Sequence, residues 1–313
     1  MVESRIVIPV VVGSSPIGHP IIPAVHASPR RWNRPARAAN ATAGEAFVAS
    51  TRAALEQIAA NVTGAAAGRN PEYLHQLRVG VRRMRSALRA FRVLLRRRRA
   101  DAIERPWRAI MQSLGSARDL DVFQQALGVG ELRLLAGKRR AETQRLARAL
   151  VNSPRFRAAQ RQTFDWTHGH PWRRHADPAE PLSQFARPAL QRLHENLCKA
   201  AHGIDWRDAA RRHRVRIRVK RMRYGCEFLA TAYAHRRTSD FVNGLHTLQD
   251  ILGELNDIAM LRRLLRTMVP RVSPLKLIEA ASALRLRLAS RERQLIVALD
   301  PAWTSFEARR PFW

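Results

Sequence analysis

The sequence contains one motif twice, and this repeat restricts the possible folds more than any other feature. The segments HQLRVGVRRMR (75–85) and HRVRIRVKRMR (213–223) align at an offset of 138 residues (213 − 75). A Leu-Gly pair and, four residues after its glycine, an aspartate align at the same offset, Asp119 with Asp257. Because two separated motifs share one offset without gaps, we infer an internal duplication and expect two similar halves.

Both halves have the pattern of α-helices. From Thr42 onward, apolar residues recur every three or four positions, and the helix-favouring residues Ala, Leu and Arg are abundant. The sequence therefore predicts an all-α fold. Helices are expected at 43–61, 71–99, 101–115, 118–128, 131–150, 154–168, 182–202, 206–235, 237–253, 256–269 and 273–299.

The helical region is expected to form one domain made of two repeats. A segment with three prolines separates the two sets of helices and is typical of a linker. The expected divisions are an extended or disordered leader (1–41), the helical domain (42–300) with its first repeat (42–168), linker (169–181) and second repeat (182–300), and a C-terminal tail (301–313).

Charge restricts the partners. The chain has 56 Lys and Arg against 25 Asp and Glu, a formal net charge of +31. Such an excess repels itself unless a polyanion offsets it, so nucleic acid, polyphosphate or an anionic membrane surface are candidate partners. Arginine far outnumbers lysine, and its planar guanidinium is well suited to phosphate oxygens.

Membrane insertion and disulfides are not expected. The apolar leader stretch Ile6–Val25 is interrupted by prolines and glycines, so it cannot form one spanning helix, and it lacks a convincing signal-peptide cleavage site. The two cysteines, Cys198 and Cys226, lie in apolar helical patterns, which is typical of core residues in a reducing compartment. We therefore expect a cytoplasmic protein.

The repeated helix carries a basic stripe beside an apolar one. At about 100° per residue, a His/Arg face and a Leu/Val/Met face lie roughly 110° apart. The basic positions are His75, Arg78, Arg82 and Arg85 in the first copy and His213, Arg216, Lys220 and Arg223 in the second. A helix with one apolar face can also simply expose its charges to water. The stripe flanks the core face, contains almost no acids and recurs in the same register, so we interpret it as a binding site.

The histidines and aspartates of the motifs have several possible roles. His75 and His213 lack a second ligand at helical spacing, which argues against zinc and favours hydrogen bonding to phosphate. Asp119 and Asp257 are either N-caps or first-turn acids of the following helices, or carboxylates that orient the stripe arginines. The residues leave these two alternatives open. No metal and no cofactor are expected.

Four segments resemble the motifs of the CHAD family, the conserved-histidine α-helical domains. They are HQLRVGVRRMRSALRAF, LGSARDLDVF, HRVRIRVKRMRYGCEFL and LQDILGELND, and the resemblance covers roughly residues 42–300. It implies two four-helix bundles related by pseudo-twofold symmetry, whose basic residues line a shared groove. It also implies binding of inorganic polyphosphate and association with polyphosphate granules.

The resemblance extends to individual residues. The family's basic positions fall on the residues of the two repeated motifs, and two further basic residues share the 138-residue offset. The implied polyphosphate-binding residues are His75, Arg78, Arg82, Arg83, Arg85, His213, Arg216, Lys220, Arg221 and Arg223, with Arg108 and His246 added by the offset. Many CHAD domains follow a triphosphate tunnel domain with the motif ExExK, which this sequence lacks, so we do not expect an enzyme.

Three functions compete for the basic stripe. Polyphosphate needs cations but no stacking platform, and Phe91 is the only aromatic residue between Leu74 and Arg99. Nucleic-acid binding through phosphates is the alternative, although single-strand binders usually interleave aromatics with their basic groove. A phosphohydrolase or kinase would need a carboxylate pair for a metal or a P-loop, and neither motif is present.

Overall fold

The computed structural model describes residues 28–32, 40–128, 130–233, 235–270 and 273–313, of which 235 and 237 are described by their backbone only. Within these residues the fold is all-α, with two isolated β-bridges and no strand. The helices are α1 (Ala43–Ala67), α2 (Pro71–Ala90), α3 (Arg97–Ser113), α4 (Gly115–Ala126), α5 (Glu131–Val151), α6 (Pro154–His168), α7 (Leu182–Ala201), α8 (Ala209–Leu229), the short 3₁₀ helix η1 (Ala230–Ala232), α9 (His235–Met268) and α10 (Leu275–Glu307).

Local sequence signals place the start of the first two helices. The Thr42 side chain accepts a hydrogen bond from the Glu45 N–H while the Glu45 carboxylate accepts one from the Thr42 N–H, which is a capping box. At the start of α2 the Asn70 side chain accepts a hydrogen bond from the Glu72 N–H, and Pro71 occupies the first helical position, where a missing N–H is harmless. Between them Gly68 ends α1 with φ of 67°, a conformation that glycine adopts readily.

The helix expected at 71–99 ends at Ala90 instead. The chain then turns, and the linker packs against the turn. Leu95 forms an isolated bridge with Trp172, and the Arg96 N–H donates a hydrogen bond to the Pro171 carbonyl at 3.0 Å. A continuous helix would use these backbone groups internally, so the pairing with the linker ends α2 and allows α3 to begin at Arg97.

Two C-terminal helices are longer than expected. The break expected between 253 and 256 does not occur, and α9 runs through Gly253 because Leu252 and Leu255 on either side remain buried. Likewise α10 continues past residue 300 and through Pro301 to Glu307, with Trp303 and Phe306 buried in its last turns. In both places tertiary burial outweighs the weak helix propensity of glycine or proline.

The predicted leader lies mostly outside the described residues, and its described part is ordered against the helices. The linker is also packed rather than free: the Ala43 and Gly44 N–H groups donate to the carbonyls of Glu180 and Pro178. These bonds fix the connection between the two sets of helices at one end of the molecule.

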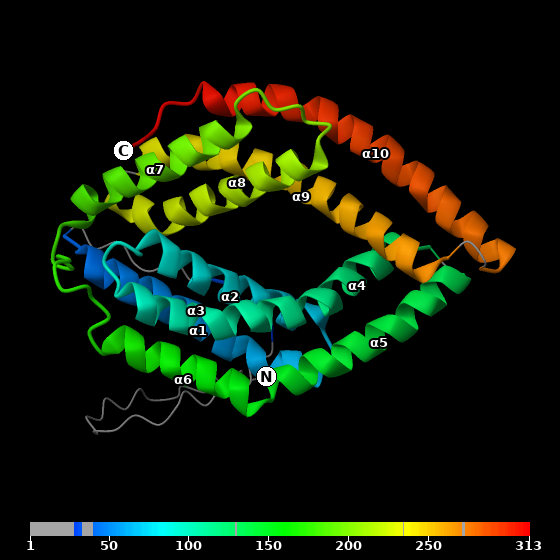
Figure 1. Ribbon diagram of the computed structural model, residues 1–313, viewed down its shortest axis with the longest axis horizontal. Helices are drawn as coiled ribbons and strands as arrows, with labels where there is room; N and C mark the ends of the chain where they lie inside the picture. Colours follow the sequence, from blue (N-terminus) through cyan, green and yellow to red (C-terminus); the bar gives the residue numbers. More distant parts are fainter. Residues whose placement is uncertain (1–27, 33–39, 129, 234, 271–272) are drawn as a thin grey trace, which may run out of the picture.

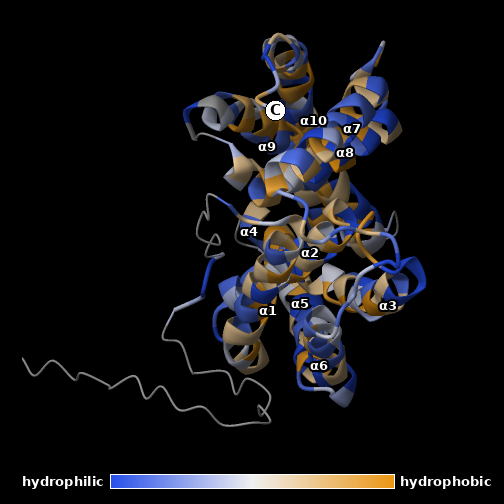
Figure 2. Ribbon diagram, turned by 90° about the vertical axis from the view of Figure 1, so that its left-hand side faces the viewer, coloured by the Kyte–Doolittle hydropathy of each residue, from blue (hydrophilic) through white to orange (hydrophobic). Residues whose placement is uncertain are grey.

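The helices form two groups that share a core. Figure 1 shows α1–α6 on one side and α7–α10 on the other, with α2 beside α8 at the centre and α4 and α5 approaching α9 and α10 at one end. One buried cluster lies within the first group, and a larger one joins both groups, for example where Phe91 stacks on Phe185 at 5.4 Å. Figure 2 shows apolar residues between the helices and hydrophilic residues outside. None of the described helices has both the length and the apolar character needed to cross a membrane.

Candidate functional site

The two basic stripes meet where α2 lies beside α8. Arg82 of α2 interacts electrostatically with Arg78 on its own helix and with Arg216 and Lys220 on α8. Arg118 of α4 also acts on Arg78. We call the whole group, with His75, the central cluster; its members are His75, Arg78, Arg82, Arg118, Arg216 and Lys220.

The central cluster is partly buried and poorly neutralised. Burial, followed by the positive charge of Arg82, lowers the pKa of Arg78 to about 10. The same two causes in the same order, with Arg216 added, lower the pKa of Lys220 to about 7. Burial also lowers the pKa of Arg216 and, with Arg118, that of His75. Each of these lowered pKa values means that the site disfavours positive charge, as expected where like charges lie close together.

Two guanidinium groups of the cluster have donors with nothing to bind. Within the described part of the chain, Nη1 of Arg78 and Nε of Arg216 are buried and have no hydrogen-bond partner. Buried donors are normally satisfied, and a buried unpaired charge is strongly unfavourable. The cluster is therefore complementary to an anion that supplies several oxygen acceptors.

Two carboxylates face the cluster from α4 and α9. Asp119 and Asp257 both act on the cluster cations, and Asp119 also accepts a hydrogen bond from Nη2 of Arg263 at 3.3 Å. Burial raises the pKa of Asp119, and Arg78 opposes this rise. Neither aspartate caps a helix or lies in a first turn, since α4 begins at Gly115 and Asp257 lies within α9. Their role in orienting arginines stays a prediction.

Another group of the predicted residues is engaged in ion pairs. Arg85 and Arg89 donate to Oε1 of Glu104 on α3, and Arg108 lies 3.8 Å from the same oxygen. Glu227, near the end of α8, likewise pairs with Arg83 at 3.1 Å and with Arg223. Glu104 belongs to another helix, whereas Glu227 lies four residues after Arg223 and so continues the second stripe.

Three further predicted residues are Arg221, His213 and His246. Arg221 is partly buried beside Arg89, and its Nε has no hydrogen-bond partner among the described residues. His213 and His246 are exposed, and neither is among the groups acting on the cluster. Sequence reasoning missed Arg118, because its counterpart at the 138-residue offset is Asn256, and only positions that are basic in both copies were selected.

Glu104 should contribute to stability because it neutralises several arginines at once. Its side chain is 5% exposed. We expect Glu104→Gln to lower the free energy of unfolding by about 3 kcal/mol, since it leaves buried cations unpaired. Urea unfolding monitored by circular dichroism measures this loss.

The matched control is Asp101→Asn. Asp101 lies on α3 like Glu104, is 48% exposed and pairs with Arg92. Solvent screens an exposed pair of this kind, so its loss should change the stability little. Equal effects of the two substitutions would contradict the assigned role of Glu104.

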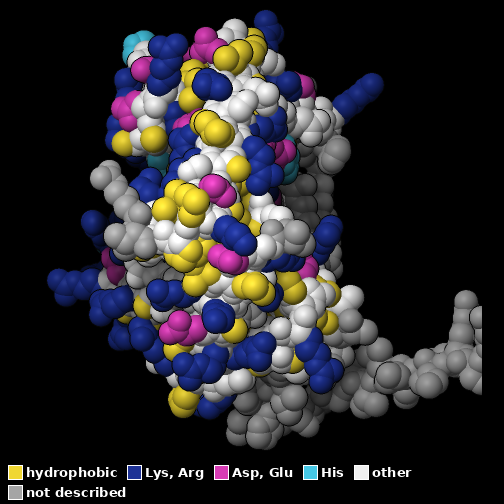
Figure 3. Space-filling model, turned by 90° about the vertical axis from the view of Figure 1, so that its right-hand side faces the viewer, with side chains coloured by type: hydrophobic (Ala, Val, Ile, Leu, Met, Phe, Trp, Pro, Cys, Tyr) yellow, Lys and Arg dark blue, Asp and Glu magenta, His cyan; other side chains and the backbone are white. Residues whose placement is uncertain are grey.

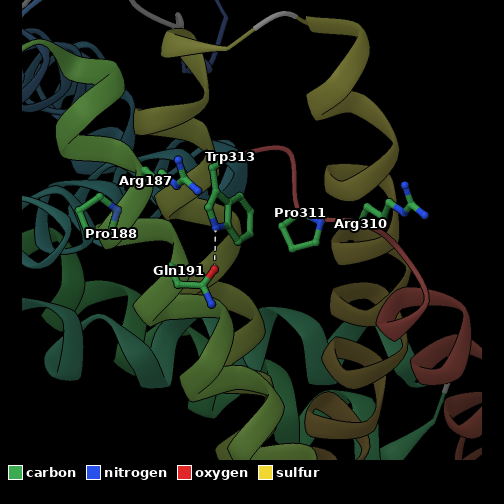
Figure 4. A pocket seen from close by; sticks show the side chains of 6 residues that line it. All are labelled: Arg187, Pro188, Gln191, Arg310, Pro311 and Trp313. Atoms are coloured by element: carbon green, nitrogen blue, oxygen red, sulfur yellow. Dashed lines mark hydrogen bonds between the residues drawn. The ribbon is translucent and has the colours of Figure 1, made fainter.

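Elsewhere the described surface carries charges of both signs and a hollow away from the predicted site. Figure 3 shows Lys and Arg scattered over one end face, with acidic and apolar side chains among them. A hollow of about 630 Å³ lies between α7 and the C-terminal segment, where Nε1 of Trp313 donates to Oε1 of Gln191 at 3.0 Å (Figure 4); no predicted site residue lines it. Among the described residues, no three His, Cys, Asp or Glu side chains form a group able to hold a metal ion.

Comparison with known proteins identifies the family to which this fold belongs. Residues 49–266 match the CHAD domain. The chain belongs to the CHAD family. The crystal structure of the CHAD domain from the plant Ricinus communis is similar to this chain, with 30% sequence identity, a TM-score of 0.77, and coverage of 91% of this chain and 98% of that one.

A more distant structure shares the CHAD fold seen here. PptA from Streptomyces chartreusis has 16% identity and a TM-score of 0.65, with coverage of 84% of this chain and 100% of that one. No curated protein matches the chain.

Proposed function

We propose that this CHAD protein binds inorganic polyphosphate without catalysis, in a groove formed by the central cluster. The observation that carries the proposal is the set of buried guanidinium donors without partners, contributed by both α2 and α8. The CHAD family is associated with polyphosphate, which supports the same choice of ligand. A location at polyphosphate granules follows from this proposal.

The proposal includes the duplication as the origin of the site. The 138-residue offset relates Arg78 to Arg216 and Arg82 to Lys220, and all four belong to the central cluster. Two bundles related by a pseudo-twofold axis between α2 and α8 would explain why equivalent residues meet. A chain of phosphates has no sequence and no bases, so such a symmetric set of cations suits it.

Aromatic placement favours polyphosphate over nucleic acid. Tyr224, the aromatic residue nearest to the second stripe in the sequence, is 3% exposed and lies under the guanidinium of Arg223 at 4.3 Å. It therefore cannot stack on a base, and stacking gives single-strand binders much of their affinity. Catalysis is not part of the proposal, because the carboxylates that act most strongly on Arg78 and Lys220, those of Asp119, Asp121 and Asp257, lie amid an excess of cations.

Competition at several salt concentrations tests the proposed ligand. We expect polyphosphate to displace labelled RNA or DNA at a far lower phosphate concentration than the reverse. If about four phosphates are neutralised, the affinity for polyphosphate should fall about 100-fold between 50 and 200 mM salt, by analogy with DNA. Fluorescence anisotropy measures both effects, and a contest won by nucleic acid would replace this proposal by the alternative.

A further inference from the structure

A short part of the leader, residues 28–32, is attached to α1 through its backbone. The Arg30 N–H donates to Oδ1 of Asn61 at 3.1 Å, and Nδ2 of Asn61 donates back to the Arg30 carbonyl at 2.9 Å. Asn61 is fully buried, and its Nδ2 also donates to the Gln57 carbonyl. This reciprocal pairing holds the segment firmly, because releasing it would leave Oδ1 and one N–H of the buried Asn61 amide without their partners.

The attachment places Trp32 over the junction between the two groups of helices. Its ring lies 4.9 Å from the guanidinium carbon of Arg83 on α2. It also meets the ring of Phe228 on α8 edge to face, with 6.1 Å between ring centroids. Trp32 is the described residue of the leader that packs against both hydrophobic clusters.

Arg83, covered by Trp32, is the ionic link between α2 and α8. Its Nη1 donates to Oε1 of Gln57 on α1 at 3.2 Å, and its Nε donates to Oε2 of Glu227 on α8 at 3.1 Å. The other oxygen of Glu227 accepts from Arg223. An indole ring over a guanidinium attracts it and shields it from water, which strengthens its ion pair.

We propose that Trp32 is a positioning residue, which holds α2 against α8 through the Arg83–Glu227 pair and so sets the spacing of the central cluster. Arg83 directly follows Arg82 on α2, and Glu227 lies two turns beyond Lys220 on α8. A shift at this junction would therefore move the cations of one stripe relative to the other. The effect on ligand binding rests on the proposed polyphosphate function.

Binding measurements on the full chain compare three substitutions. Trp32→Ala should weaken polyphosphate binding about tenfold and reduce its salt dependence, because fewer cations reach the ligand together. Trp32→Phe retains a ring over Arg83 and should restore binding to near the wild-type value. Phe164→Ala removes a 39% exposed aromatic residue from α6 and should change nothing.

The stoichiometry of binding separates positioning from simple stabilisation. If Trp32 only stabilised the fold, Trp32→Ala would lower the fraction of active protein while the dissociation constant and the salt dependence of that fraction stayed normal. That result would overturn the proposal. Should Trp32→Ala fail to fold by circular dichroism, Trp32→Leu keeps part of the apolar volume without the aromatic contact and takes its place.

A measurement without ligand keeps this inference separate from the proposed function. Nitroxide labels at Arg155→Cys on α6 and Arg293→Cys on α10, in a chain with Cys198→Ala and Cys226→Ala, report the distance between the two groups of helices. We expect Trp32→Ala to broaden the distance distribution and Trp32→Phe to leave it narrow. An unchanged distribution in Trp32→Ala would refute the positioning role, whereas failure of the wild-type chain to bind polyphosphate would refute only the proposed function.

Discussion

Replacing Arg78 and Arg216 together by glutamate should abolish polyphosphate binding, with a loss on the order of 1000-fold or more. Each arginine has a buried donor without a partner among the described residues, so each is free to donate to a phosphate oxygen. Hydrogen bonds to charged groups contribute about 1.5–3 kcal/mol each, and the two new carboxylates would add repulsion. Isothermal titration with polyphosphate of defined length measures the loss.

The matched control is Arg139→Glu with Arg145→Glu, two exposed arginines of α5. This pair changes the net charge by the same amount but lies outside the central cluster. If binding depended only on the overall charge of the protein, both double variants would lose affinity equally. Retained affinity in the Arg78/Arg216 variant, with helicity confirmed by circular dichroism, would show that the ligand binds elsewhere.

Polyphosphate binding should also depend steeply on pH, because of Lys220. Its pKa of about 7 results from burial first and then from Arg82 and Arg216, with Arg223 adding to these and Asp257 opposing them. A bound phosphate chain reverses this balance and raises the pKa toward its ordinary value. Binding therefore takes up about one proton at pH 8, and the affinity should fall by about tenfold per pH unit between about pH 7.5 and 9.

Titrations in buffers with different ionisation enthalpies measure the proton uptake directly. Lys220→Arg keeps a positive charge throughout this range, so it should bind with little pH dependence above pH 7. For the empty protein the sign is opposite: the pKa of Lys220 is lower in the folded than in the unfolded chain, so its contribution to stability improves as pH rises from about 7 toward 10.5. Equal pH dependence of wild type and Lys220→Arg would exclude Lys220 as the titrating group.

The sequence predicted the all-α fold, but several helix ends and Arg118 were missed. The helical period places Arg78 and Arg82 on one face of α2, and the repeat does the same for Arg216 and Lys220 on α8. Apart from the two pairs four residues apart on one helix, Glu104–Arg108 and Arg223–Glu227, the ion pairs of these arginines could not be predicted in this way. Glu104 reaches Arg85 from 19 residues further along the chain, and Glu227 reaches Arg83 from 144 residues away. Only the packing of helices decides which arginines such acids neutralise.

The repeat pattern also hid differences between the halves. At the 138-residue offset Glu104 corresponds to Val242, and Glu227 corresponds to Arg89. Neither of these acids therefore has an acidic counterpart in the other half, and a comparison that looks only for matching residues passes over both. The early end of α2 could not be predicted from the sequence pattern either, because it depends on hydrogen bonds to the linker around Pro171.

The core that joins the two groups of helices also restricts how such a protein could be divided. Phe91 on the first side stacks flat on Phe185 on the second, and Phe47, Leu88 and Leu190 belong to the same buried cluster. A half-length chain cut within the linker would expose this surface to water. Such halves should aggregate or pair with one another rather than fold alone.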